Sequence, residues 1–297
     1  MKHGDFFSPV GQWALESGLN IEVTAGSFLG FDFTNWPEAL LPTEEDDHFN
    51  DDFLHIAISA MRERVQVINA FALCLHSATV ELDKISYGGF RVTHEDLVHF
   101  DDPLKGYGGP GLAHLPSIPG QGILLPFPER HGTCPAATIE HACKQLDAVL
   151  QSPHPKSLAL VALTNHALNA CKGHDFELAV ATAWTACESL LESLWDEYTR
   201  TQAALHSLSV TRKRRAQWAG RDFTASIIVE VMTLAGTISP ELSTAIGDVR
   251  SKRNKWIHGI AAASYQDAID AVNLARDLLD EVMDLKFKVA PAVGVSF

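Results

Sequence analysis

Three side chains near the end of one predicted helix have types and a spacing that could do chemistry: Arg253, Asn254 and His258. An imidazole titrates near neutral pH and can accept or donate a proton. A guanidinium can pair with two oxygens of one anion. Asn254 and His258 are four residues apart and therefore share one face of a helix. A structural interpretation stays open, in which Arg253 extends along apolar surface to solvent, Asn254 is a polar flank and His258 caps the helix end.

The helix that must position these side chains is predicted over 241–258. Ser239-Pro240 is a helix-opening pair, and Gly259 is expected to end the helix. At about 100° per residue, one stripe is apolar: Leu242, Ala245, Ile246, Val249, Trp256, Ile257 and Ile260. Arg253 falls inside this stripe, where a charge costs desolvation unless it is paired. Glu188 on a neighbouring helix is a candidate partner, and Asp248 is a weaker candidate for orienting a base.

The remaining periodicity predicts a chain that is mainly α and has two parts. Residues 1–137 form an acidic α+β region, with strands at 21–24, 28–33 and 85–92 and a helix from 53 to 75. Residues 138–290 form an all-α up-and-down bundle with short loops. Its other helices are expected at 138–150, 155–172, 175–198, 222–235 and 264–286, and Asp175 caps the third of them.

The segment Arg253-Asn254-Lys255-Trp256-Ile257-His258-Gly259 resembles the signature of the HEPN superfamily. The resemblance covers roughly residues 150–290 and includes the helical bundle around the motif. It implies a metal-independent endoribonuclease that acts as a homodimer with a composite active site. His258 would be the general acid or base, Arg253 would stabilise the transition state, and Asn254 would orient His258 or the phosphate.

The reaction that the resemblance implies is cleavage of single-stranded RNA by attack of the ribose 2′-OH on the adjacent phosphate. Its products would be 2′,3′-cyclic phosphate and 5′-hydroxyl ends, and DNA would be spared because it lacks the 2′-OH. A role as a toxin or in antiviral defence is expected at the family level only. The alternative is a catalytically inactive HEPN-like module for partner or nucleotide binding and dimerisation. A purely structural bundle is a third hypothesis.

Two groups of cations could bind the RNA backbone. Arg212, Lys213, Arg214 and Arg215 form a basic segment between two predicted helices, followed by Trp218 and Arg221. Arg250, Lys252 and Lys255 surround the motif and could bind the flanking phosphates. Both groups could equally be solvated surface.

The rest of the sequence narrows the function classes. Five scattered cysteines without a CxxC pair favour a reducing cytoplasm over a disulfide framework. His131, Cys134, His141 and Cys143 have no familiar zinc spacing, so no metal and no cofactor are expected. No apolar run reaches the length of a membrane span, so no membrane partner is expected.

The net charge of −14 is concentrated in residues 1–150, which carry 21 acidic and 8 basic side chains. Such a surface could repel RNA or bind a regulatory partner, or it could simply aid solubility.

Overall fold

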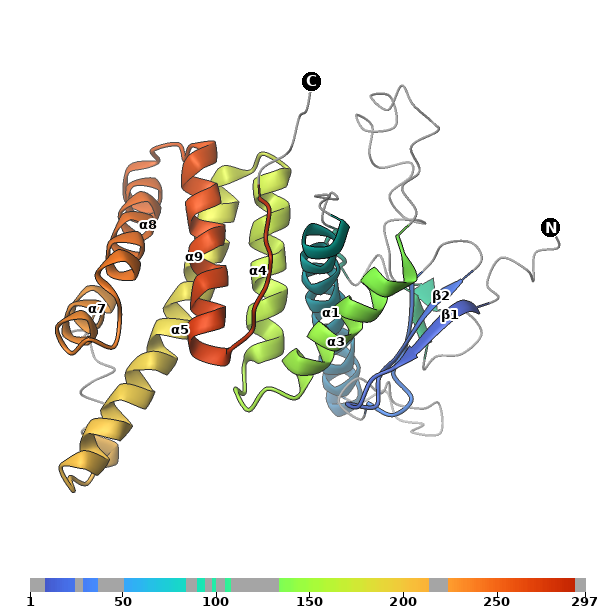
Figure 1. Cartoon of the computed structure of the whole chain (residues 1–297), viewed down its shortest axis with the longest axis horizontal. Coiled ribbons are helices and arrows are strands. Elements are labelled where there is room, and N and C mark those ends of the chain that lie inside the picture. Colours follow the sequence, from blue (N-terminus) through green and yellow to red (C-terminus); the bar gives the residue numbers. More distant parts are fainter. Residues whose placement is uncertain are drawn as a thin grey trace. The chain divides into compact units, whose positions relative to one another are not determined.

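A computed structural model describes residues 9–24, 29–36, 51–83, 90–93, 98–99, 105–107, 134–213 and 224–291. These residues are mostly helical, with a small antiparallel sheet, which confirms the prediction of a mainly α chain (Figure 1). The chain divides into two compact units, Met1–Asn165 and His166–Phe297.

The first unit contains the sheet and two long helices. The five described strands are β1 (Pro9–Ala14), β2 (Asn20–Thr24), β3 (Leu29–Asp32), β4 (Val98–His99) and β5 (Lys105–Tyr107). They are all antiparallel, in the order β1-β2-β3-β5-β4. Helix α1 (Asp51–Ala78) continues as a short π-helix, η3 (Thr79–Asp83), and packs against α3 (Ala136–Leu150).

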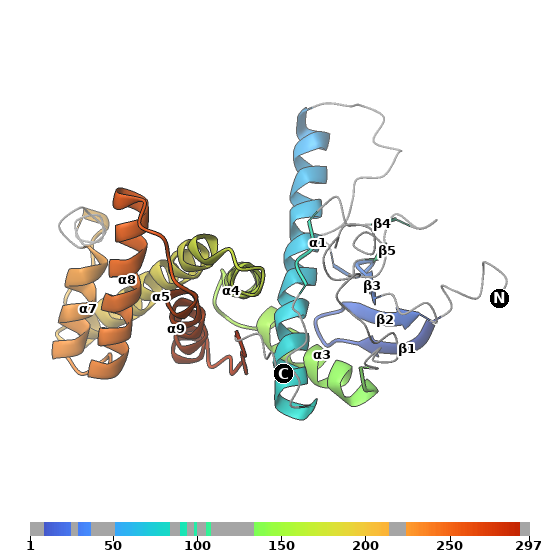
Figure 2. The same ribbon diagram turned by 90° about the horizontal axis from the view of Figure 1, so that it is seen from above.

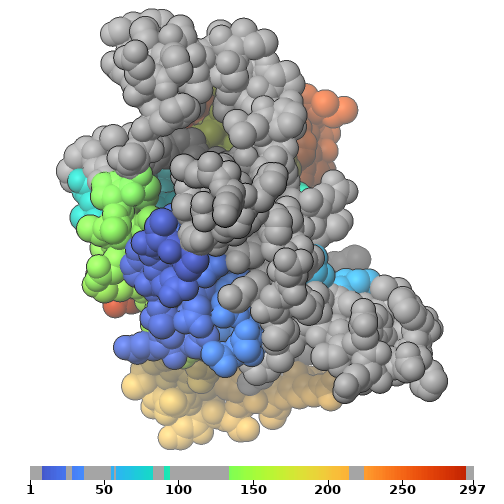
Figure 3. Space-filling model, turned by 90° about the vertical axis from the view of Figure 1, so that its right-hand side faces the viewer, coloured from blue at the N-terminus to red at the C-terminus, as the bar shows by residue number. Residues whose placement is uncertain are grey.

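The sheet and the helices of this unit share an aromatic core. Phe31 of β3 meets Phe71 of α1 edge to face, with ring centroids 5.4 Å apart. The carboxylate of Asp147 on α3 accepts backbone N–H groups of Glu16 and Ser17 at 3.1 and 3.0 Å, which holds the turn between β1 and β2. Figure 3 shows the blue strand residues and the green α3 residues side by side on one face.

The strand expected at 85–92 is not found in its described part. Residues 90–93 carry no strand pairing. Instead the side-chain amide of Asn69 donates to the Val92 carbonyl at 2.8 Å and accepts the Val92 N–H at 2.9 Å. A buried side chain therefore satisfies backbone groups that a neighbouring strand would otherwise pair with.

Helix α1 also corrects the expectation about long apolar runs. Ile58–Leu82 is long and apolar enough to cross a membrane by length and composition alone, and 67% of its most apolar window is buried inside the protein. Arg62, Glu63 and Arg64 interrupt its first turns, which is why the run is not evident in the sequence. Most of α1 packs as a core helix, and the guanidinium of Arg64 lies 5.2 Å from the Phe33 ring centroid.

The second unit is built from helices. Helix α4 (Ser157–Lys172) contains the boundary between the units, and α5 (Phe176–Leu205), α7 (Ala225–Leu234), α8 (Pro240–Gly259) and α9 (Tyr265–Met283) follow. Helix α9 packs along α5, and α8 contacts α5, α7 and α9, as both views show (Figures 1 and 2). The apolar faces of these helices supply a core of fully buried side chains that includes Trp184, Leu190, Met232 and Leu278.

The division between the units differs from the boundary expected after residue 137. Helix α3 lies in the first unit, because its apolar face (Ile139, Ala142, Cys143, Leu146) packs with α1. Helical periodicity shows that α3 has an apolar face but not which helix that face will contact.

Candidate functional site

Helix α8 begins where the sequence predicts. Ser239 is the N-cap, its hydroxyl accepts the Leu242 N–H at 3.1 Å, and Pro240 occupies the first turn. The other end differs from the prediction. Gly259 is still helical, and the left-handed residue that ends α8 is Ile260, with φ 52°. The N–H groups of Ile260 and Ala261 donate back to the carbonyls of Trp256 and Lys255, which is how a helix usually satisfies its last carbonyls.

The three predicted site residues lie on the last two turns of α8. Arg253 and Asn254 are half-buried and His258 is exposed. The Arg253 guanidinium donates from Nη1 to Oδ1 of Asn254 at 3.1 Å. Asn254, which was expected to orient His258 or the phosphate, thus contacts Arg253 among the described residues. The imidazole of His258 contacts no described residue through a hydrogen bond or ion pair, so it is open to an incoming group.

The apolar stripe of α8 is covered at one end only. Ile246 and Val249 are buried, Trp256 is half-buried, but Ile257 is 44% exposed and Ile260 is 87% exposed. Ile260 leaves the stripe because its left-handed conformation takes it out of helical register. Arg253 therefore lies where the stripe passes from the core to the surface, and its charge keeps partial contact with solvent.

The expected ion pair between Arg253 and Glu188 does not form. Among the described residues, the polar contact recorded for Arg253 is the one with Asn254. A half-buried guanidinium retains hydration, so it needs no buried carboxylate on α5.

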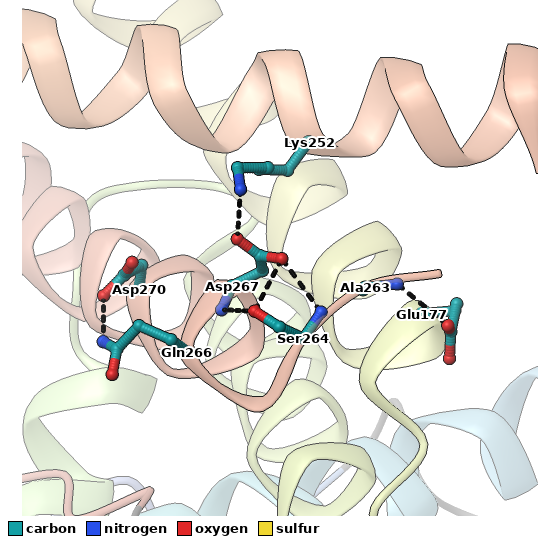
Figure 4. A network of polar contacts seen from close by, with 7 residues as sticks. All are labelled: Glu177, Lys252, Ala263, Ser264, Gln266, Asp267 and Asp270. Carbon is teal, nitrogen blue, oxygen red and sulfur yellow. Dashed lines mark hydrogen bonds and ion pairs between the residues drawn. The ribbon is translucent and has the colours of Figure 1, made fainter. Parts of the chain in front are cut away.

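The cations around the motif have different environments. The Nζ of Lys252 is 2.8 Å from Oδ1 of Asp267 on α9, and this contact raises the pKa of Lys252 (Figure 4). Lys252, which was expected to bind a flanking phosphate, thus has a carboxylate partner within the protein and keeps a side chain that is 47% exposed. Arg250 is half-buried and Lys255 is exposed, and both stay available to an anion.

Two residues of the basic segment, Arg212 and Lys213, are described, and they come after the C-terminal end of α5. Glu177, in the first turn of α5, accepts the N–H of Ala263, just beyond the end of α8. Arg212 and Lys213 are exposed and follow the last turn of the same 30-residue helix, which is about 45 Å long. Figure 1 shows this antiparallel arrangement of α5 and α8. Arg214 and Arg215, with Trp218 and Arg221, lie outside the described residues. The described cations Arg212 and Lys213 thus follow the end of α5 opposite to the one that contacts Ala263.

The described histidine and cysteine residues that were considered for a metal have different surroundings. His141 lies 3.3 Å from the carboxylate of Glu81, while Cys143 is buried and Cys134 is exposed. His131 lies outside the described residues. Within the part of the chain that the structure describes, no group of three or more His, Cys, Asp or Glu side chains could hold a metal ion.

Two carboxylates near the site were not anticipated. Asp267 and Ser264 form a capping box at the start of α9, and a Ser-x-x-Asp sequence before an apolar run is a signal that could have revealed it. The hydrogen bond from Ala263 to Glu177 joins residues 86 apart. No local pattern could have predicted it.

Comparison of the chain with family models, with curated proteins and with solved structures finds no match. Any functional hypothesis for α8 therefore depends on its residues and their geometry.

Proposed function

We propose that this protein is a metal-independent endoribonuclease that cleaves single-stranded RNA at the C-terminal end of α8, within a HEPN-like bundle. One observation carries the proposal. An exposed imidazole, His258, shares a helix with a guanidinium, Arg253, that the neighbouring Asn254 already orients at 3.1 Å. Phosphate ester cleavage needs a group that transfers protons and a cation that stabilises the growing charge, and the last two turns of α8 carry one of each.

The chemistry assigns a role to each group. One base removes the proton from the ribose 2′-OH, whose oxygen attacks the adjacent phosphorus. The bond from phosphorus to the 5′-oxygen then breaks, and an acid protonates the departing oxygen. The imidazole of His258 suits either proton transfer. The guanidinium of Arg253 pairs with the phosphoryl oxygens as their charge grows.

This mechanism requires two proton-transfer groups, and a composite site in a homodimer would provide them. Base and acid act on opposite sides of the phosphorus, so one imidazole does not serve both steps at once. A second protomer supplies another His258. Ile257 and Ile260 expose apolar surface next to that residue, and a partner's α8 would cover it.

The test is cleavage of a labelled single-stranded RNA pool in EDTA, with analysis of the product ends. The wild type should leave 2′,3′-cyclic phosphates, and His258→Ala should abolish cleavage while folding stays intact. His206→Ala is the matched control, because His206 is an exposed histidine at the far end of α5. Equal cleavage by wild type and His258→Ala would refute the proposal. RNA binding without cleavage would instead favour the alternative, a catalytically inactive module for partner or nucleotide binding and dimerisation.

A further inference from the structure

The connection between α8 and α9 is short and has an unfavourable backbone conformation. It runs from Ile260 to Ser264, immediately after the turn that carries His258. Ile260 is left-handed although it is β-branched, a conformation that glycine or asparagine adopts far more readily. Such a conformation persists only where the surrounding contacts enforce it. We therefore expect contacts close to the connection to hold Ile260 in its left-handed conformation.

Four polar contacts surround the connection (Figure 4). The Glu177 carboxylate on α5 accepts the Ala263 N–H at 2.9 Å. Asp267 accepts the backbone N–H and the hydroxyl of Ser264 at 2.9 and 2.8 Å. The same carboxylate pairs with Lys252 on α8 at 2.8 Å. The start of α5, the last turns of α8 and the start of α9 are thereby tied to one another.

The last turn of α8 depends on these ties. Helix ends fray unless their free carbonyls and side chains are held. His258 has no hydrogen bond or ion pair of its own among the described residues, and Ile257 and Ile260 add little burial. What holds this turn is the backbone bonding of Ile260 and Ala261, which requires the chain to enter the connection in one conformation.

We propose that Glu177 is a positioning residue, which acts together with the Lys252–Asp267 pair to hold the turn carrying His258 at a fixed place relative to Arg253. The catalytic part of this inference rests on the proposed function of α8. Its structural part, that Glu177 keeps the end of α8 ordered, is independent of that function. In this proposal Lys252 supports catalysis by its ion pair with Asp267 and not by binding RNA phosphates.

The activity test compares Glu177→Ala with Glu177→Gln. Loss of the acceptor should lower kcat for RNA cleavage about tenfold and change KM less than about twofold, because the imidazole is misplaced while RNA binding surfaces remain. Glutamine keeps an acceptor oxygen and should restore most of kcat. Glu192→Ala, which removes an exposed carboxylate elsewhere on α5, should change neither. Equal kcat values for the two alanine variants, or a glutamine variant as impaired as Glu177→Ala, would overturn the proposal.

Lys252→Ala separates the two roles of that lysine. A positioning role predicts a lower kcat with KM retained, whereas a phosphate-binding role predicts a higher KM and a smaller salt dependence of RNA binding. The second pattern would contradict the assignment made here.

Amide hydrogen exchange tests the structural part without any RNA. Glu177→Ala should lose protection at Ala263 and at Ile260, and Glu177→Gln should keep it. Unchanged exchange at Ile260 in Glu177→Ala would overturn the inference even if the enzyme is active. If the wild type does not cleave RNA, the proposed function fails, and the exchange data still decide whether Glu177 holds the end of α8.

Discussion

Arg253 and Asn254 are adjacent in the chain, and their side chains meet at 3.1 Å on the surface of α8. Neighbours in a helix usually point about 100° apart, so this contact uses the reach of the long arginine side chain. An amide oxygen that fixes a guanidinium reduces the entropy lost when an anion binds. At the scale of single residues, Asn254 therefore restricts the Arg253 side chain, while His258 is exposed and forms no hydrogen bond or ion pair with a described residue.

The cysteines give a prediction at the same scale. Burial raises the pKa of the Cys143 thiol to about 12 and that of Cys171 to about 11, and it raises those of Cys74 and Cys187 as well. Because the thiolate is the nucleophile, these four should react slowly. Only Cys134 is exposed among the five. A thiol-specific chromogenic reagent at pH 8 should modify one thiol quickly in the native protein and five in denaturant. Cys134→Ser should lose the fast phase, and a second fast thiol would contradict the burial pattern.

At the scale of secondary structure, α8 is well capped at its start but contains a glycine, a residue of low helix propensity, in its middle. Gly247 lies in its middle, is exposed, and a Cβ there would meet no atom within 4 Å. Gly247→Ala should raise the free energy of unfolding by roughly 1 kcal/mol, because alanine restricts the unfolded chain and favours the helix. Urea denaturation followed by circular dichroism measures the change. Gly236→Ala is the control and should lower the free energy of unfolding, because Gly236 has φ +72° and a side chain in that conformation is strained.

The start of α9 gives a prediction on pH. Partial burial alone would raise the pKa of the Asp267 carboxyl, but the hydrogen bonds from Lys252 and Ser264 outweigh it and hold that pKa below its ordinary value. A lowered pKa in the folded state contributes stability above the unfolded value of about 3.9, and this contribution is lost as the pH falls through the folded value. The wild type should therefore exceed Asp267→Asn in stability more at pH 6 than at pH 3. An equal difference in urea denaturation at both pH values would show that the carboxylate charge contributes nothing.

At the scale of the whole molecule, the two ends of α5 have different neighbours: Glu177 at its start contacts the connection after α8, and the exposed cations Arg212 and Lys213 follow its end. The homodimer that we propose gives a prediction at this scale. Ile257→Asp places a charge on the exposed part of the α8 stripe and should convert a wild-type dimer into a monomer in size-exclusion chromatography with light scattering. Cleavage should be lost together with the dimer. A wild-type monomer that cleaves RNA would rule out the composite site.

The amino-acid sequence by itself determined the features that depend on neighbours in the chain. Asp175 and Ser239-Pro240 begin α5 and α8 as predicted, because a cap needs only the backbone two or three residues ahead. Helical spacing likewise places Arg253, Asn254 and His258 on the last turns of α8.

Tertiary structure alone decided the rest: that α3 packs on α1, that Lys252 pairs with Asp267, and that Glu177 accepts the Ala263 N–H. It also decided that Ile257 is 44% exposed although it belongs to the apolar stripe of α8. The physical reason is that periodicity states which face of a helix is apolar. Which helix covers that face, and which charged side chains meet, depend on how the helices of each unit pack around its core.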